Sequence, residues 1–505
     1  MLFNSHIFIL AFLPATLVGF FLLARLQTSL AARLWLLAAS LVFYGWWSLP
    51  HLAQLLGVVL CNYLLARAIA SARARDGMRA RWLMQLGVAA NVAWLAWFKY
   101  ATFIAGNVAA LTGLDFAIGA VVLPLAISFY TFQQIAYLVD VQRGQAEAYG
   151  LLDYALFVTF FPQLIAGPIV HHAEMMPQFR RASTYRFQDD AFAAGIAFFV
   201  MGLVKKLAIA DPVGALATPT FAAAGDPGML EAWLAVSAFT VGLYFDFSGY
   251  SDMAVGLARM VGIRLPYNFA SPYQAESIID FWRRWHMTLS RFLRDYVYIP
   301  LGGSRRGTAR RHVNLMATML LGGLWHGAGW TFLAWGGLHG FYLLVNHAWA
   351  ATLARRIVLP RLAAWGLTLL AVMVAWVFFA APSLDAAFGV LGGMAGMNGI
   401  GPRPPQVGLL VDVLLGRQAI ELEGHASLLA VVEGAASLAA LMLGWLLVLL
   451  APNSQAIVDG GMADRPAWAA LRFRPSVATG IVAAAAFLFA LTLMAEVKEF
   501  VYFQF

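Results

Sequence analysis

Apolar stretches long enough to cross a membrane recur along the whole chain, and they limit its fold more than any other feature. A helix crosses the hydrocarbon core with about 20 residues, and inside that core only helices or closed barrels satisfy their own backbone groups. The stretches cover residues 6–24, 33–49, 51–70, 82–98, 119–139, 151–170, 190–210, 231–258, 312–330, 331–350, 362–381, 427–451 and 477–495. We therefore predict an all-α polytopic membrane protein with about 11 to 13 membrane helices, together with re-entrant and interfacial helices.

Composition excludes a water-soluble fold. Hydrophobic residues make up 62% of the 505 residues and charged residues only 11%, whereas about a quarter of an ordinary soluble domain is charged. The net charge of +8 would also suit nucleic acid, but the basic residues stand in short runs between apolar stretches. Such runs are typical of loops on the cytoplasmic side of a membrane. Membrane lipids are therefore expected partners, and nucleic acid is not.

Arginine-rich loops predict which side of the membrane each loop faces. By the positive-inside rule the following belong to the cytoplasm: Arg73, Arg75, Arg79 and Arg81; Arg180, Arg181 and Arg186; Arg355, Arg356 and Arg361; and the dense basic run from 283 to 311. The connection from 382 to 426 carries Asp385, Asp412, Glu421 and Glu423 against Arg403 and Arg417, so it is expected outside. Counting spans from the first loop puts both termini outside as well.

A histidine stands inside the apolar run LLGGLWHGAGW, residues 320–330. Polar side chains are costly at membrane depth and are functional by default, and an imidazole with an unperturbed pKa of about 6.5 suits general-base catalysis. Helical spacing places Thr318, Gly322, His326 and Gly329 along one face, so the His326 ring would look into a narrow cavity or tunnel. The alternative is a histidine hydrogen-bonded between helices that the glycines allow to pack closely.

Residues 277–303 have the apolar pattern of one amphipathic helix. The apolar positions alternate at spacings of four and three and are Ile278, Trp282, Trp285, Leu289, Phe292 and Tyr296. Arg284, Arg291 and Arg294 lie on the other side, which predicts a helix at the cytoplasmic interface. They are candidate ligands for the phosphates of coenzyme A or for an acidic carrier protein, and the alternative is contact with anionic lipid headgroups. His286 lies beside the apolar stripe and is expected to point toward the bundle.

Two further apolar stretches carry polar side chains that need partners in lipid. Asp246 and Asp252 lie in YFDFSGYSDMAVG, with Tyr250 one helical turn from Asp246. They could orient a catalytic histidine or bind a substrate hydroxyl, and structural bonding is the alternative. Gln133 and Gln134 in ISFYTFQQIAYLVD could line a polar path, or they could join two helices by hydrogen bonds.

No metal site is expected from the spacing of ligands along the chain. His171, His172 and Glu174 are close together, but they stand near a loop without a further ligand at a useful spacing. The sequence also lacks the HExxH, P-loop and GxSxG motifs and a cysteine nucleophile.

Five stretches together resemble the bacterial branch of the membrane-bound O-acyltransferase family, most of all the type that forms the membrane subunit of alginate O-acetylation. They are FYTFQQIAYLVDVQRG at 129–144, FFPQLIAGPI at 160–169, YFDFSGYSDMAVGLARMVGIRLPYNFASPY at 244–273, FWRRWHMTLSRFLRDYVYIPLGG at 281–303 and GGLWHGAGWTFLAWGGLHG at 322–340. The closing FVYFQF at 500–505 is also similar. The resemblance implies a single transmembrane domain over 1–505, a catalytic core at about 120–350, and a ring of tilted helices around a central funnel or tunnel.

The resemblance also implies roles for individual residues. His326 in the LWHG motif, beside Trp325, matches the family's catalytic histidine, and His286 in RRWH matches a second key position that Asn or His fills across the family. The tunnel would admit acetyl-CoA or another acyl thioester from the cytoplasm, with no permanently bound cofactor. In alginate-type systems the acceptor is a periplasmic acetyltransferase of the SGNH class.

The sequence thus predicts an acyltransferase of the bacterial inner membrane, with both termini periplasmic, that supplies acetyl groups for O-acetylation of an alginate-type exopolysaccharide. Peptidoglycan, cellulose or teichoic acid are alternative acceptors. From a different class, a transporter or lipid flippase would also contain broken helices and intramembrane carboxylates, although no inverted repeat is visible. A structural scaffold for a secretion complex would leave His286 and His326 dispensable.

Overall fold

The computed structural model describes most of the chain. The residues outside the description are 26–28, 115–118, 120, 224, 353–356, 402–424, 461–467, 469, 470, 495–499 and 501–505, and for 425–431 only the backbone is described. The remaining residues are mostly helical and contain no strand, which confirms the predicted all-α class. Arg355 and Arg356, most of the 382–426 connection and nearly all of FVYFQF lie outside the described residues.

Six helices in the described part of the chain are long and apolar enough to cross a membrane. They are α3 (Leu49–Arg73), α4 (Gly77–Thr112), the continuous run of α9 (Asp189–Val204), η3 (Lys205–Ala210) and α10 (Asp211–Ala222), then α11 (Met229–Met260), α16 (Arg361–Ala380) and the Val432–Leu450 part of α19 (His425–Leu450). Shorter apolar helices are η1 (Phe8–Phe12) with α1 (Leu13–Ala24), α2 (Ser29–Gly45), α17 (Leu384–Met394) and α21 (Val477–Thr492). The protein is therefore a multi-pass membrane protein, while the number of spans remains a prediction.

The backbone groups into two compact units, each assembled from separate parts of the chain. The first unit comprises Met1–Met201, Tyr250–Asn268 and Phe473–Ala485, and the second comprises Gly202–Gly249, Phe269–Arg472 and Ala486–Phe505. Helices α9, α11 and α21 contribute residues to both units. Each unit is therefore built from segments that are distant from one another in the sequence.

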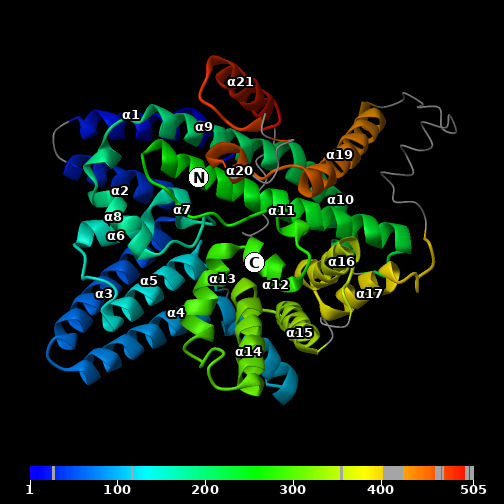
Figure 1. The fold of residues 1–505 in the computed structure, drawn as a ribbon, viewed down its shortest axis with the longest axis horizontal. Coiled ribbons are helices and arrows are strands. Elements are labelled where there is room, and N and C mark those ends of the chain that lie inside the picture. The colour runs from blue at the N-terminus through cyan, green and yellow to red at the C-terminus, as the bar shows by residue number, and fades with distance from the viewer. Residues whose placement is uncertain are drawn as a thin grey trace. The chain divides into compact units, whose positions relative to one another are not determined.

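In the first unit α3, α4 and α5 (Ile127–Arg143) lie side by side (Figure 1). Two buried asparagines join α3 to α4: Asn91 Nδ2 donates to Asn62 Oδ1 at 2.7 Å, and Asn62 Nδ2 donates to Asn91 Oδ1 at 3.2 Å. Each amide thus satisfies the other without water, as helices in lipid require. The unit also contains α6 (Leu151–Thr159), α7 (Phe161–Leu164), α8 (His172–Arg180) and η2 (Ala182–Tyr185).

The predicted 151–170 stretch is broken in the structure. Helix α6 ends at Thr159, Phe160 has non-helical angles, and α7 begins with Pro162 in its first turn. Proline has no N–H to donate and is tolerated only at the start of a helix. The stretch is therefore not one continuous helix, and whether it re-enters or crosses the membrane remains a prediction.

The second unit packs α14 (Thr308–His326) against α15 (Trp330–Thr352), and α15 against α16. It also contains η3, α10, α17 and α19, together with η4 (Pro272–Gln274), α12 (Ile278–Arg284), α13 (Met287–Leu293), η5 (Arg294–Tyr298) and α20 (Ser454–Asp459). Glycines let the backbones of α14 and α15 touch: a Cβ on Gly323 would overlap the carbonyl oxygen of Phe332, and one on Gly336 would overlap that of Met319. Small residues at such crossings are what allows close helix contact in membranes.

We expect Gly336→Ala to destabilise the second unit, because the added methyl group must displace backbone rather than a flexible side chain. Overpacking of this kind costs about 1–3 kcal/mol, which thermal unfolding in detergent would detect as a lower midpoint. Gly337→Ala is the matched control on the same helix, since its Cβ would meet nothing closer than Leu320 Cδ2 at 3.7 Å. Equal midpoints for the two variants would contradict this account of the α14–α15 contact.

Candidate active site

His326 is the last residue of α14 and is buried, with 4% of the residue exposed. The helix ends because Gly327 is extended (φ −157°, ψ 153°), at a position where a Cβ would overlap the ring of Phe332. Gly329 therefore lies beyond the helix end, and its predicted place on the helical face of His326 was wrong. The glycines of this motif bring α14 and α15 into close contact, as the alternative of closely packed helices expects. A cavity or tunnel beside His326 remains a prediction.

Aromatic rings enclose the His326 imidazole. Ring-centroid distances are 4.8 Å to Trp325, 5.0 Å to Trp335 and 5.2 Å to Phe379, each in an edge-to-face arrangement. These three rings come from the end of α14, from α15 and from the end of α16. The imidazole is thus held in an apolar setting, where electrostatic interactions are stronger than in water.

His286 interrupts the helix that the sequence predicts over 277–303. Helix α12 ends before Trp285, His286 has a left-handed backbone (φ 42°, ψ 54°), and α13 starts at Met287. The continuous amphipathic helix was therefore wrong. Trp285 and His286 are both buried at the break, with Trp285 against Phe269 at 5.0 Å and His286 against Phe247 at 4.8 Å. Burial of these two rings offsets a left-handed residue's cost of about 1–2 kcal/mol.

The two histidines meet at one indole ring. Trp325 lies 6.0 Å from His286 and 4.8 Å from His326 between ring centroids, so both imidazoles lie next to this indole in the second unit. The segment containing His286 is outside the candidate spans. Complete burial lowers the pKa of its imidazole to about 3, so the ring is neutral at pH 7 and can donate one hydrogen bond without carrying charge.

The basic side of 277–303 is partly engaged within the protein. Arg284 Nε donates to Asp280 Oδ1 at 2.9 Å, and Arg294 bonds both oxygens of Asp295 at 2.7 and 3.0 Å. The bond to Asp295 raises the pKa of the Arg294 guanidinium. Arg291, in the last turn of α13, is half-buried. The structure thus leaves their predicted role in donor binding as a prediction.

Asp246 forms a buried ion pair with a residue that the sequence reasoning missed. Lys206 Nζ lies 2.6 Å from Asp246 Oδ1 and 2.8 Å from Asp211 Oδ1, and 4.6 Å from the ring centroid of Phe500. Lys206 and Asp246 are almost completely buried. Lys206 lies in the π-helical turn η3, a kind of irregularity frequent at functional sites. This geometry favours the structural alternative for Asp246. The sequence did contain a signal for Lys206, because a lysine inside an apolar span requires an acidic partner.

The other predicted support residues lie in the first unit. Gln134 Oε1 accepts a hydrogen bond from the Tyr154 hydroxyl at 3.1 Å, which joins α5 to α6. Gln133 is buried beside it on α5. Tyr250 stacks on Phe3 at 4.8 Å, and Asp252 is half-buried on α11. These contacts tie helices of one unit together, and a role for these residues along a substrate path remains a prediction.

Comparison with known proteins shows which proteins this chain is similar to. A model of the membrane-bound O-acyltransferase family matches residues 84–384, a range that contains both histidines and Trp325. The chain is 44% identical over 427 residues to a peptidoglycan O-acetyltransferase of Helicobacter pylori, covering 79% of this chain and 81% of that protein. It is 43% identical over 393 residues to a probable alginate O-acetylase AlgI of Pseudomonas aeruginosa, covering 77% of this chain and 74% of that protein. A teichoic acid D-alanyltransferase of Lacticaseibacillus rhamnosus is more distant, at 26% identity over 318 residues, covering 59% of this chain and 75% of that protein.

We expect Lys206→Met to destabilise the protein strongly, because the buried carboxylate of Asp246 and the half-buried carboxylate of Asp211 both lose their bond to the Lys206 ammonium. Breaking a buried ion pair from one side costs about 3–5 kcal/mol, measurable as a lower unfolding midpoint. The comparison variant is Lys205→Met at the neighbouring position, which removes a hydrogen bond to Ser454 Oγ at 2.6 Å, and one hydrogen bond to a charged group contributes about 1.5–3 kcal/mol. Adding Asp246→Asn to Lys206→Met should recover part of the loss; no recovery would contradict the pairing.

Proposed function

The chain belongs to the membrane-bound O-acyltransferase family, and from this premise we propose that it moves an acetyl group from a cytoplasmic thioester across the bacterial inner membrane. Family membership makes it a multi-pass O-acyltransferase. The proposal adds the direction of transfer, the donor and the acceptor. Its main support is the burial of two imidazoles next to Trp325, in the motifs that resemble the family's catalytic motifs.

The acceptor that we propose belongs to an alginate-type pathway for a secreted polysaccharide. Several relatives at 42–43% identity are named as probable alginate O-acetylases. We propose that a periplasmic acetyltransferase of the SGNH class receives the acetyl group and passes it to the polysaccharide. Peptidoglycan is a second candidate acceptor, favoured by the H. pylori relative at 44% identity. Cellulose has no counterpart among these names, and the D-alanyltransferase similarity is weaker.

The chemical step joins an acceptor hydroxyl to the acetyl carbonyl. The hydroxyl oxygen attacks the thioester carbon while His326 takes the hydroxyl proton. The carbon–sulfur bond then breaks, and the proton passes from the imidazole to the leaving thiolate. His286, neutral at pH 7, donates a hydrogen bond to the carbonyl oxygen as negative charge develops on it. No resident cofactor enters this scheme.

Donor binding is the proposed role of Arg284, Arg291 and Arg294. The phosphates of acetyl-CoA, or the acidic surface of a carrier protein, would meet these guanidinium groups at the cytoplasmic side. Asp280 and Asp295 orient two of the three side chains, so phosphate would bind an arginine whose position is already restrained.

Both termini are proposed to be periplasmic.

We expect His326→Ala to lower acetyl transfer about 10²–10⁴-fold, because general-base catalysis contributes that much. The measurement is transfer of labelled acetyl from acetyl-CoA to an SGNH-type acceptor protein, with the purified chain reconstituted in vesicles and the acceptor on the far side. His312→Ala provides a histidine control outside the proposed site. Wild-type turnover by a folded His326→Ala variant would eliminate the proposed base, and a scaffold or transporter would then explain the chain better.

For His286 we expect asparagine to preserve more activity than alanine, because an amide N–H can still donate to the carbonyl oxygen. Loss of one such donor costs about 10²–10³-fold in turnover, so His286→Ala should fall by that factor and His286→Asn by less. Single-turnover rates in the same vesicles separate this chemical effect from donor binding. Equal rates for the wild type and both folded variants would remove the oxyanion role.

A further inference from the structure

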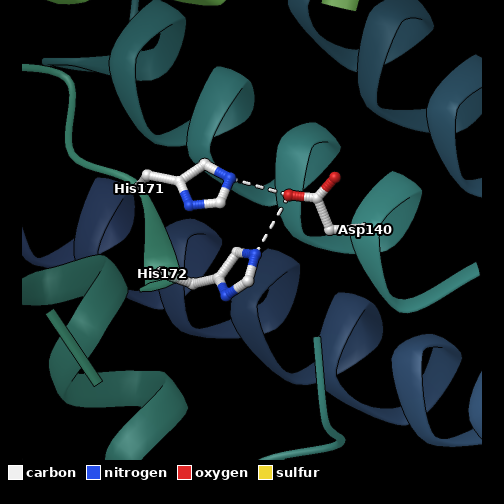
Figure 2. Close-up of side chains that lie close together, drawn as sticks. All are labelled: Asp140, His171 and His172. Atoms are coloured by element: carbon white, nitrogen blue, oxygen red, sulfur yellow. Dashed lines mark hydrogen bonds and ion pairs between the residues drawn. The ribbon is translucent and has the colours of Figure 1, made fainter. Parts of the chain in front are cut away.

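Two adjacent histidines and a distant aspartate meet in the first unit (Figure 2). Asp140 lies in the last turn of α5, His171 is the N-cap of α8, and His172 is the first residue of that helix. Nε2 of His171 lies 2.7 Å and Nε2 of His172 lies 3.0 Å from the same carboxylate oxygen, Oδ2 of Asp140. The three atoms all lie within 4.8 Å of one another. Both rings thus direct the same nitrogen at one point.

The helix start at α8 holds the two rings in this arrangement. Glu174 accepts a hydrogen bond from the backbone N–H of His171 at 3.3 Å, as the third residue of a capping box. Glu174 is therefore a helix cap, and Asp140 takes the place of third ligand. Asp140 and His172 are buried, whereas the His171 side chain is 29% exposed. The cluster therefore reaches the surface of the described structure at the His171 side chain.

A further oxygen lies behind one of the rings. Nδ1 of His172 is 3.5 Å from the Tyr149 hydroxyl, and the Arg180 guanidinium covers the Tyr149 ring at 5.2 Å. An imidazole that binds metal through one nitrogen usually donates its other N–H to a neighbouring oxygen, which fixes the tautomer and the ring orientation. Tyr149 is placed to accept that hydrogen bond.

We propose that Asp140, His171 and His172 bind a divalent transition metal ion of the zinc class. Two imidazole nitrogens and one carboxylate oxygen are a donor set that zinc accepts, with water in a fourth position. The ion would join the end of α5 to the start of α8, between residues 31 positions apart, so its role is to fix these helices. The expectation of no metal site was based on spacing along the chain, and Asp140 enters only through the fold.

Hydrogen bonds alone are the competing explanation for the cluster. In that state both Nε2 atoms carry protons and donate to Asp140, and Nδ1 of His171 accepts from the Ala173 N–H at 3.3 Å. Metal binding would shift the His171 proton to Nδ1 and give up this long contact. Arg143 lies 3.9 Å from the other carboxylate oxygen, Oδ1, and partly balances the aspartate charge in either state. The two states therefore differ in their response to added metal.

The test is metal binding by the full-length chain, purified in detergent through a tag without histidines and stripped with a chelator. Titration with Co²⁺ would reveal imidazole ligation in the visible spectrum, and zinc content after gel filtration would give the stoichiometry. We expect a single ion per chain in the wild type and about 100-fold weaker binding or worse in His172→Ala and Asp140→Asn. His326→Ala and His312→Ala should bind as the wild type does, which separates this site from catalysis.

A second measurement distinguishes the loss of metal binding from the misfolding of a variant. Zinc should raise the unfolding midpoint of the wild type and leave that of His171→Ala unchanged, since an ion stabilises only a folded state that binds it. His171 is at the exposed rim, so its replacement disturbs the core least. Absence of zinc binding to the wild type, or binding that all three ligand variants retain, would overturn the proposal and leave a hydrogen-bonded cluster. The metal proposal does not rest on the proposed acetyl transfer, so neither result decides that function.

Discussion

Polar groups that leave water must find partners inside the protein, and this requirement governs the whole structure. Helices satisfy their backbones internally, and some of the buried charged and amide side chains are paired across helices: Asn62 with Asn91, and Lys206 with Asp246. Partners in hydrocarbon cannot be exchanged for water, so each pair fixes the register of two helices. A chain with 11% charged residues therefore gains much of its specificity from a small number of contacts.

The helices around His326 depend on the absence of side chains. Gly323 and Gly336 bring the backbones of α14 and α15 into contact, and Gly327 ends α14 directly after the histidine. The imidazole consequently projects from a helix end into rings supplied by α15 and α16. The position of this ring therefore depends on glycines, which contribute no functional group of their own.

Much of this arrangement could be predicted from the sequence, and the remainder could not for physical reasons. Apolar run length identifies membrane helices, and the LWHG and RRWH motifs identified His326 and His286 as candidates. The apolar repeat from Ile278 to Tyr296 continues unchanged through His286, so periodicity cannot reveal the break there. The Asp140–His172 and Lys206–Asp246 pairs join residues 32 and 40 positions apart. Hydrophobic pattern reports which face is buried, not which residues on two faces meet.

The left-handed backbone at His286 limits which amino acids can occupy this position at all. Outside glycine, that region of conformational space is populated mainly by asparagine, aspartate and histidine, and β-branched residues are nearly excluded from it. Asparagine and histidine, the pair expected here from the family resemblance, both satisfy this steric filter as well as offering an N–H group. The residue types allowed at position 286 are therefore restricted by the backbone conformation as well as by the proposed chemistry. If a relative had valine at this position, its backbone would have to differ there, whether or not its reaction differed.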